Sequence, residues 1–135
     1  MKVSEAMSPM VLIIGPEHTL RDAARLMSER KVGAAVVVNV DSSGPGILTE
    51  RDILNALGQG LDPDEEVAGD HLTGDLVFAS AEWDVARAAA AMVRGNFRHL
   101  VVTDEVGEVV GMLSVRDVVR VGVAAQMLSP SAGAA

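Results

Sequence analysis

The chain has 135 residues, of which 49% are hydrophobic, and these values are typical of a compact domain with a hydrophobic core. It contains no cysteine, which excludes disulfides, thiolate nucleophiles and cysteine metal sites, and its three histidines are too far apart in sequence to predict a metal site. The net charge of −8 argues against nucleic acid as a partner, because nucleic-acid binding depends on a basic surface.

The first half of the chain predicts five elements in the order β-α-β-β-α. Thr19 is a suitable helix N-cap with an acidic residue three positions later, and apolar residues follow it at helical spacing from Leu20 to Met27. Short apolar runs bounded by turn residues predict the strands. The predicted elements are a strand over 11–14, a helix after Thr19, strands over 34–38 and 46–48 joined by a turn over 41–45, and a helix after Thr49.

The second half repeats this order at an offset of 65 residues. Segment 46–54 reads GILTERDIL and segment 111–119 reads GMLSVRDVV. The same offset aligns the apolar residues of the preceding helix and strand, so the similarity extends over the whole unit and indicates an internal repeat. The predicted elements are a strand over 76–79, a helix after Asp84, strands over 100–103 and 109–113, and a helix after Ser114.

One such repeat could not bury a sheet face and two helices by itself. We therefore predict an α/β fold in which two β-α-β-β-α motifs pack sheet to sheet with pseudo-two-fold symmetry. Motif 1 is placed at residues 1–62 and motif 2 at residues 63–128, with a polar, turn-rich linker over 58–66. The small residues of 129–135 predict a disordered tail.

Each repeat has a strand-to-helix junction with the pattern Gly-h-h-Thr/Ser-x-x-Asp, where h is an apolar residue. In one interpretation Thr49 and Asp52, like Ser114 and Asp117, only cap a helix, which is worth about 0.5–2 kcal/mol. In the other, the helix N-terminus and the hydroxyl bind a phosphate, the carboxylate accepts hydrogen bonds from two ribose hydroxyls, and the glycine allows close approach of a ligand or backbone. The pattern alone leaves both interpretations open.

The repeated order of elements and the two junctions resemble the CBS domain family, named from cystathionine β-synthase, over residues 3–125. The resemblance implies that Thr49 and Ser114 bind phosphate and that Asp52 and Asp117 bind ribose. It also implies a base pocket between the repeats, formed by the start of each middle strand and by the junction strands. The residues that it assigns to this pocket are Gly33, Ala34, Ile47, Arg98, His99 and Met112.

The two implied sites differ in charge. Only the second repeat places cationic side chains, Arg98 and His99, at the start of its middle strand, where the first repeat has a glycine and an alanine. The first repeat also carries Glu50 beside its threonine. We therefore predict that the Asp117 site binds a charged nucleotide more tightly than the Asp52 site.

Arg51 and Arg116 follow the caps by two residues and are further candidates for phosphate contacts, although an arginine in a first helical turn is usually solvated. A catalytic role is not expected, because the sequence contains no nucleophile motif, phosphate-binding loop motif or metal cluster. Asp52 and Asp117 occupy equivalent positions, which suits two binding sites better than one acid-base pair.

These observations predict a stand-alone regulatory module that binds an adenine nucleotide in the cleft between the motifs, without a catalytic cofactor. AMP is the favoured ligand, and ADP, ATP, NAD and S-adenosylmethionine remain open. We expect the module to signal to a separate effector protein or through self-association as a homodimer, with 86–91 and 118–125 as candidate helix-packing segments. The alternative is a ligand-free interaction module that mediates dimerisation.

The expected compartment is the cytoplasm. The N-terminus lacks the apolar segment of a signal peptide, and no apolar run reaches the length of about 18 residues that a membrane span needs. We therefore expect no membrane partner.

Overall fold

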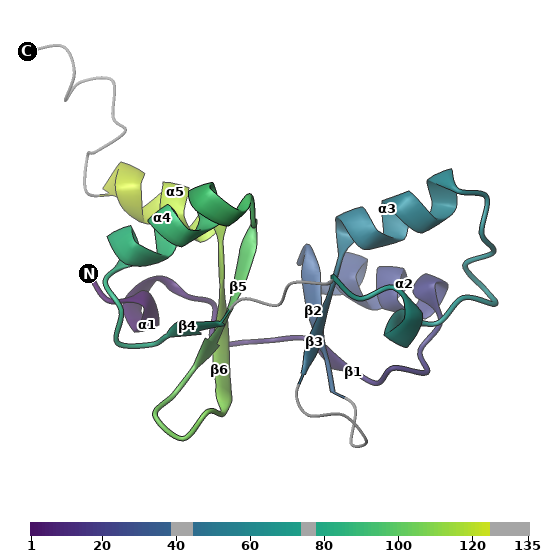
Figure 1. Cartoon of the computed structure of the whole chain (residues 1–135), viewed down its shortest axis with the longest axis horizontal. Helices are drawn as coiled ribbons and strands as arrows, with labels where there is room; N and C mark the ends of the chain where they lie inside the picture. Colours follow the sequence, from purple (N-terminus) through teal and green to yellow (C-terminus); the bar gives the residue numbers. More distant parts are fainter. Residues whose placement is uncertain (39–44, 74–77, 125–135) are drawn as a thin grey trace, which may run out of the picture. The chain divides into compact units, whose positions relative to one another are not determined.

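The computed structural model describes residues 1–38, 45–73 and 78–124, which form two compact units (Figure 1). The first-repeat unit contains residues 11–38 and 45–73, and the second-repeat unit contains residues 1–10 and 78–124. Each has the order β-α-β-β-α with a three-stranded sheet, so the predicted α/β fold with two repeats is confirmed. That the two sheets pack against each other stays a prediction.

Three sequence predictions fall on residues beyond the described ranges. The turn predicted over 41–45 and the strand predicted over 76–79 lie partly outside them, and the tail predicted over 129–135 lies entirely outside.

The first-repeat unit is built on a sheet with the strand order β1 (Ile13–Ile14), β2 (Ala34–Val37) and β3 (Gly46–Thr49). Strands β1 and β2 are parallel, and α2 (Leu20–Arg30) connects them. Strands β2 and β3 are antiparallel, and α3 (Glu50–Gly58) follows β3 without an intervening loop. The last residue of β3 therefore lies directly at the start of a helix.

The second-repeat unit has the same topology. Its sheet has the order β4 (Phe78–Ser80), β5 (His99–Thr103) and β6 (Val109–Ser114). The parallel pair β4 and β5 is connected by α4 (Val85–Gly95), and β5 is antiparallel to β6. Helix α5 (Val115–Ala124) follows β6 directly, so the second strand-to-helix junction is equivalent to the first.

The crossover helices begin and end at the residues that local chemistry favours. The side chain of Thr19 accepts a hydrogen bond from the third residue of α2 at 3.1 Å, and Asp84 caps α4 in a similar way at 2.8 Å. Both helices end at a residue in the left-handed conformation, Lys31 with φ 57° and Asn96 with φ 56°. The predicted starts of α2 and α4 are therefore confirmed.

Each unit also contains a short segment that directly precedes the other repeat in the sequence. The N-terminal arm, residues 1–10 with α1 (Val3–Ala6), belongs to the second-repeat unit. The linker arm, residues 66–73 with the 3-10 helix η1 (Ala68–Asp70), belongs to the first-repeat unit. The repeats thus exchange arms, and the division of the sequence into motifs at residue 62 stays a prediction.

The two arms are held by equivalent backbone hydrogen bonds. Val3 N–H donates to Trp83 O at 2.8 Å, and Ala68 N–H donates to His18 O at 2.8 Å. The two donor residues are 65 positions apart in the sequence, and so are the two acceptor residues. This distance is the offset of the repeat. The repeat therefore extends to the arms, which the sequence prediction of β-α-β-β-α units did not include.

Each unit has its own hydrophobic core between the helices and one face of its sheet. In both cores the crossover helix contributes an alanine and a methionine, and the two longer strands contribute aliphatic side chains. The equivalent core pairs are Ala23 and Ala88, Met27 and Met92, Ala35 and Leu100, Val37 and Val102, and Leu48 and Leu113. Burial of this apolar surface fixes the sheet against the helices and thus the ends of the strands.

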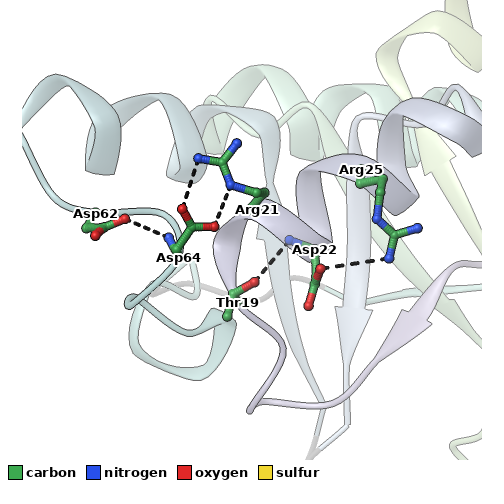
Figure 2. A network of polar contacts seen from close by, with 6 residues as sticks. All are labelled: Thr19, Arg21, Asp22, Arg25, Asp62 and Asp64. Atoms are coloured by element: carbon green, nitrogen blue, oxygen red, sulfur yellow. Dashed lines mark hydrogen bonds and ion pairs between the residues drawn. The ribbon is translucent and has the colours of Figure 1, made fainter.

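The polar linker folds back onto the start of α2 (Figure 2). Arg21 donates hydrogen bonds to both carboxylate oxygens of Asp64, one of them from Nη2 to Oδ2 at 3.1 Å. Asp64 N–H donates to Asp62 Oδ1 at 2.9 Å. The guanidinium of Arg21 holds the pKa of the Asp64 carboxyl below its ordinary value, mainly through this hydrogen bond.

Candidate functional site

The first junction contains a capping box. Thr49 ends β3 and caps α3: its N–H donates to Asp52 Oδ2 at 2.7 Å, and Asp52 N–H donates to Thr49 Oγ1 at 3.3 Å. The Thr49 hydroxyl also donates to Asp52 Oδ2 at 2.9 Å. A further hydroxyl, from Thr73 of the linker arm, donates to the same oxygen at 2.7 Å. The carboxylate is thus fixed in position at the N-terminus of the helix.

The second junction has the same capping bonds but different neighbours. Ser114 N–H donates to Asp117 Oδ2 at 2.9 Å, and Asp117 N–H donates to Ser114 Oγ at 3.1 Å. Arg120, one turn along α5, donates from Nη2 to Asp117 Oδ1 at 3.1 Å and to the backbone oxygen of Ala6 at 2.9 Å. The carboxylate is therefore linked through Arg120 to the N-terminal arm.

The start of each middle strand lies beside its junction, as the sequence predicts. Glu50 N–H donates to Gly33 O at 2.9 Å, and Val115 N–H donates to Arg98 O at 2.9 Å. Because these are the first N–H groups of α3 and α5, each helix N-terminus adjoins the residue that precedes β2 or β5.

The other predicted pocket residues lie on the paired strands. The register pairs Ala34 with Thr49, His99 with Ser114, Ile47 with Val36 and Met112 with Val101. Side chains alternate along a strand, and the neighbours Leu48 and Leu113 belong to the cores, so Ile47 and Met112 lie on the sheet face that points away from the helices. The structure therefore gathers each half of the predicted residues at one junction, and their role as a pocket stays a prediction.

Three arginines near the junctions are exposed: Arg51, Arg98 and Arg116. Within the described part of the chain, none of the three makes an ion pair or a side-chain hydrogen bond. A bound anion could therefore recruit them without breaking a contact of the protein. Arg98 is the only one of the three in a predicted base pocket.

Thr73 and Arg120 were not predicted as part of the site. Arg120 follows Asp117 by three residues, which is a spacing at which helical side chains meet, so the sequence contained a signal for this contact. Thr73 is separated from Asp52 by 21 residues, and only the exchange of arms brings the two together.

Each junction combines a helix N-terminus and a hydroxyl, which are groups that interact favourably with anions, with a carboxylate, which is an acceptor for hydroxyl groups. Across residues 1–38, 45–73 and 78–124, no cluster of three or more histidine, cysteine, aspartate or glutamate residues is placed to hold a metal ion. In the same part of the chain, no helix has the length and hydropathy that a membrane crossing needs.

A family model and a curated relative match this chain over most of its length. The family model for the CBS domain matches residues 3–59 and again residues 67–124. An uncharacterised 17.7 kDa protein of Acidianus ambivalens is 33% identical over 119 residues, which make up 88% of this chain and 71% of that protein. The chain spans between 19% and 61% of the length of several other curated relatives.

Two solved structures are similar to this chain over most of its length. A CBS domain protein from Pyrobaculum aerophilum complexed with AMP has a TM-score of 0.78 and 34% identity, with 87% of this chain and 89% of that chain covered. A hexameric CBS-CP12 protein from bloom-forming cyanobacteria has a TM-score of 0.81 and 26% identity, with 88% of this chain and 69% of that chain covered.

Proposed function

The chain belongs to the CBS domain family, whose model matches both repeats, and from this premise we propose that it is a regulatory module that binds an adenine nucleotide. The observation on which the proposal rests is the similar protein complexed with AMP, which is 34% identical over most of both chains. AMP is the ligand we propose. ADP, ATP, NAD and S-adenosylmethionine contain the same adenosine group and are the alternatives.

The phosphate is proposed to bind at the N-termini of α3 and α5. In each helix the first N–H donates to the residue that precedes the middle strand, and the third donates to the capping hydroxyl. The second N–H, that of Arg51 or Arg116, has no backbone acceptor within the described residues, so it can donate to a phosphate. The Asp52 and Asp117 carboxylates are proposed to accept hydrogen bonds from the ribose.

We propose that the Asp117 site binds AMP more tightly than the Asp52 site. The Thr49 hydroxyl donates to Asp52, whereas the Ser114 hydroxyl donates to no acceptor within the described residues and can donate to a phosphate oxygen. The exposed guanidinium of Arg98 adds a positive charge beside the second junction, where the first repeat has Gly33.

The bound nucleotide is proposed to act on a separate effector protein or on self-association, and not to undergo catalysis. The hexameric relative supports self-association. The equivalent residues Leu54 on α3 and Val119 on α5 are 68% and 45% exposed, and packing of these helices against a second copy would bury both. A homodimer is the assembly we propose.

A thermal-shift panel tests this function. Ligand-free protein is heated with AMP, ADP, ATP, NAD or S-adenosylmethionine. A ligand at 100 times its Kd stabilises the folded state by about 2.7 kcal/mol, which raises Tm by several degrees. A shift with at least one of these compounds supports the proposal, and no shift with any of them contradicts it.

A matched pair of variants separates binding from helix capping. Asp117 is the third residue of α5 and lies at a predicted site, whereas Asp22 is the third residue of α2, where no ligand is predicted. Asp117→Ala and Asp22→Ala therefore remove the same side chain from equivalent positions of two helices. We expect only Asp117→Ala to reduce the ligand-induced shift. An equal reduction in both variants would show that stability and not binding is lost.

A ligand-free interaction module is the second candidate. It is favoured by the capping bonds of the two junctions, because Asp52 and Asp117 already accept backbone hydrogen bonds and therefore have a structural role without a ligand. This candidate predicts a defined oligomer that forms equally with and without AMP, which can be measured by analytical ultracentrifugation.

A further inference from the structure

We propose that Thr73 is a specificity-determining residue that prevents the Asp52 carboxylate from binding both hydroxyls of a ribose in a bidentate way. This inference rests on the proposed function, because it concerns which of the two sites accepts the nucleoside part of the ligand. It gives a second cause of unequal affinity, which is independent of the charge difference between the sites.

The Oδ2 oxygen of Asp52 has no room for another donor. It accepts hydrogen bonds from Thr49 N–H at 2.7 Å, the Thr49 hydroxyl at 2.9 Å and the Thr73 hydroxyl at 2.7 Å. A carboxylate oxygen has about two lone-pair sites, so three donors saturate it. The Oδ1 oxygen accepts no hydrogen bond from the described residues. A vicinal diol that places one hydroxyl on each oxygen must therefore displace both hydroxyl donors, the Thr49 hydroxyl, which can rotate away on its own side chain, and the Thr73 hydroxyl of the linker arm.

The carboxylate of Asp117 is open by comparison. Among the described residues, its Oδ2 oxygen accepts one hydrogen bond, from Ser114 N–H, and its Oδ1 oxygen accepts one, from the exposed Arg120 side chain. Each oxygen therefore keeps one lone-pair site. Both hydroxyls of a ribose can bind at once without displacing a donor of the protein.

One part of this difference comes from a pair of equivalent residues in the exchanged arms. Thr73 N–H donates to Ile47 O at 2.9 Å, and Ser8 N–H donates to Met112 O at 2.9 Å, so the two residues have the same backbone position. Their hydroxyls have different acceptors, because the Thr73 hydroxyl donates to Asp52, whereas the Ser8 hydroxyl donates to Met10 O at 3.4 Å and not to Asp117. The Thr73 hydroxyl is thus the group of the arms that distinguishes the two carboxylates, beside the different donors within the junctions, the Thr49 hydroxyl and Arg120.

Thr73→Val tests the inference, because valine keeps the shape of threonine and lacks the hydroxyl. The Asp52 carboxylate remains fixed by Thr49 N–H, and the Thr49 hydroxyl can rotate away to leave one lone-pair site of Oδ2 to the ribose. AMP is titrated by calorimetry into Asp117→Ala and into Asp117→Ala with Thr73→Val, so that only the first site is measured. We expect Thr73→Val to tighten binding by about tenfold, since one more hydrogen bond to a charged group becomes available.

The matched control is Ser8→Ala in an Asp52→Ala background, in which only the second site is measured. We expect no change in AMP affinity, because the Ser8 hydroxyl does not contact Asp117. Unchanged or weaker binding after Thr73→Val would overturn the inference, while AMP binding by the unsubstituted protein would still support the proposed function. Absence of AMP binding by the unsubstituted protein would overturn both.

Discussion

A methyl group added at Gly111 should push the N-terminal arm away from strand β6. A Cβ atom added there would lie 2.8 Å from the backbone oxygen of Ser8 and closer still to the side chain of Met7. The equivalent Gly46 differs, because a Cβ atom there would meet only the flexible side chain of Leu72 at its nearest contacts. We therefore predict that Gly111→Ala destabilises the protein and that Gly46→Ala has a smaller effect.

The magnitude follows from the bonds that the clash breaks. Ser8 and Met112 exchange two backbone hydrogen bonds, at 2.9 and 3.0 Å, and Ser8 cannot retreat without lengthening both. Loss of both would cost about 1–3 kcal/mol, which corresponds to a fall in Tm of at least about 3 °C for a chain of this size. The gain of about 0.4–1 kcal/mol from a less flexible unfolded chain applies to both variants, so their difference isolates the clash.

Thermal unfolding followed by circular dichroism measures the two Tm values, and amide hydrogen exchange localises the change. In Gly111→Ala the N–H of Ser8 should exchange faster, whereas in Gly46→Ala the N–H of Thr73 should stay protected, because its bond to Ile47 O is not in the path of the added methyl group. Equal losses of Tm in the two variants, or unchanged exchange of the Ser8 amide, would show that the added methyl group at position 111 does not displace Ser8.

Two further predictions concern charged side chains. The guanidinium of Arg21 lowers the pKa of the Asp64 carboxyl, so the stability from this pair is complete above about pH 3.9, the unfolded value, and is lost as pH falls through the lower folded pKa. The Tm difference between the unsubstituted protein and Asp64→Asn should therefore be larger at pH 7 than at pH 3, and a difference independent of pH would contradict this. Arg98→Gln should weaken AMP several-fold in calorimetry and leave adenosine unchanged, because only AMP has a phosphate, and equal weakening of both would exclude a phosphate contact.

The helix caps could be predicted because capping is a local interaction. Thr49 and Asp52, like Ser114 and Asp117, are three residues apart, and the geometry of a helix N-terminus brings residues at this spacing together wherever the chain folds. The repeat made this prediction stronger, since the same pattern recurs in the same context. The topology of the sheets followed from the same repeated order of elements.

The exchange of arms could not be predicted in the same way. Helix α1 has only four residues, and its N-cap Lys2 is not a residue that favours this position, so Glu5, which accepts from Lys2 N–H at 3.3 Å, is a weak signal by itself. The contact of Thr73 with Asp52 depends on the path of the linker arm across the unit, which no periodic pattern encodes. The alignment at an offset of 65 did place Ser8 opposite Thr73, but an alignment does not show which hydroxyl reaches a carboxylate.

The most direct test of the nucleotide-binding proposal is a calorimetric titration of AMP into the ligand-free protein, into Asp117→Ala and into Asp22→Ala. We predict that the unsubstituted protein and Asp22→Ala bind AMP with the same affinity and that Asp117→Ala loses the tighter site, with a fall in affinity of about tenfold or more. An Asp117→Ala variant that is folded and binds AMP as tightly as the unsubstituted protein would show that the ribose is not bound at this junction.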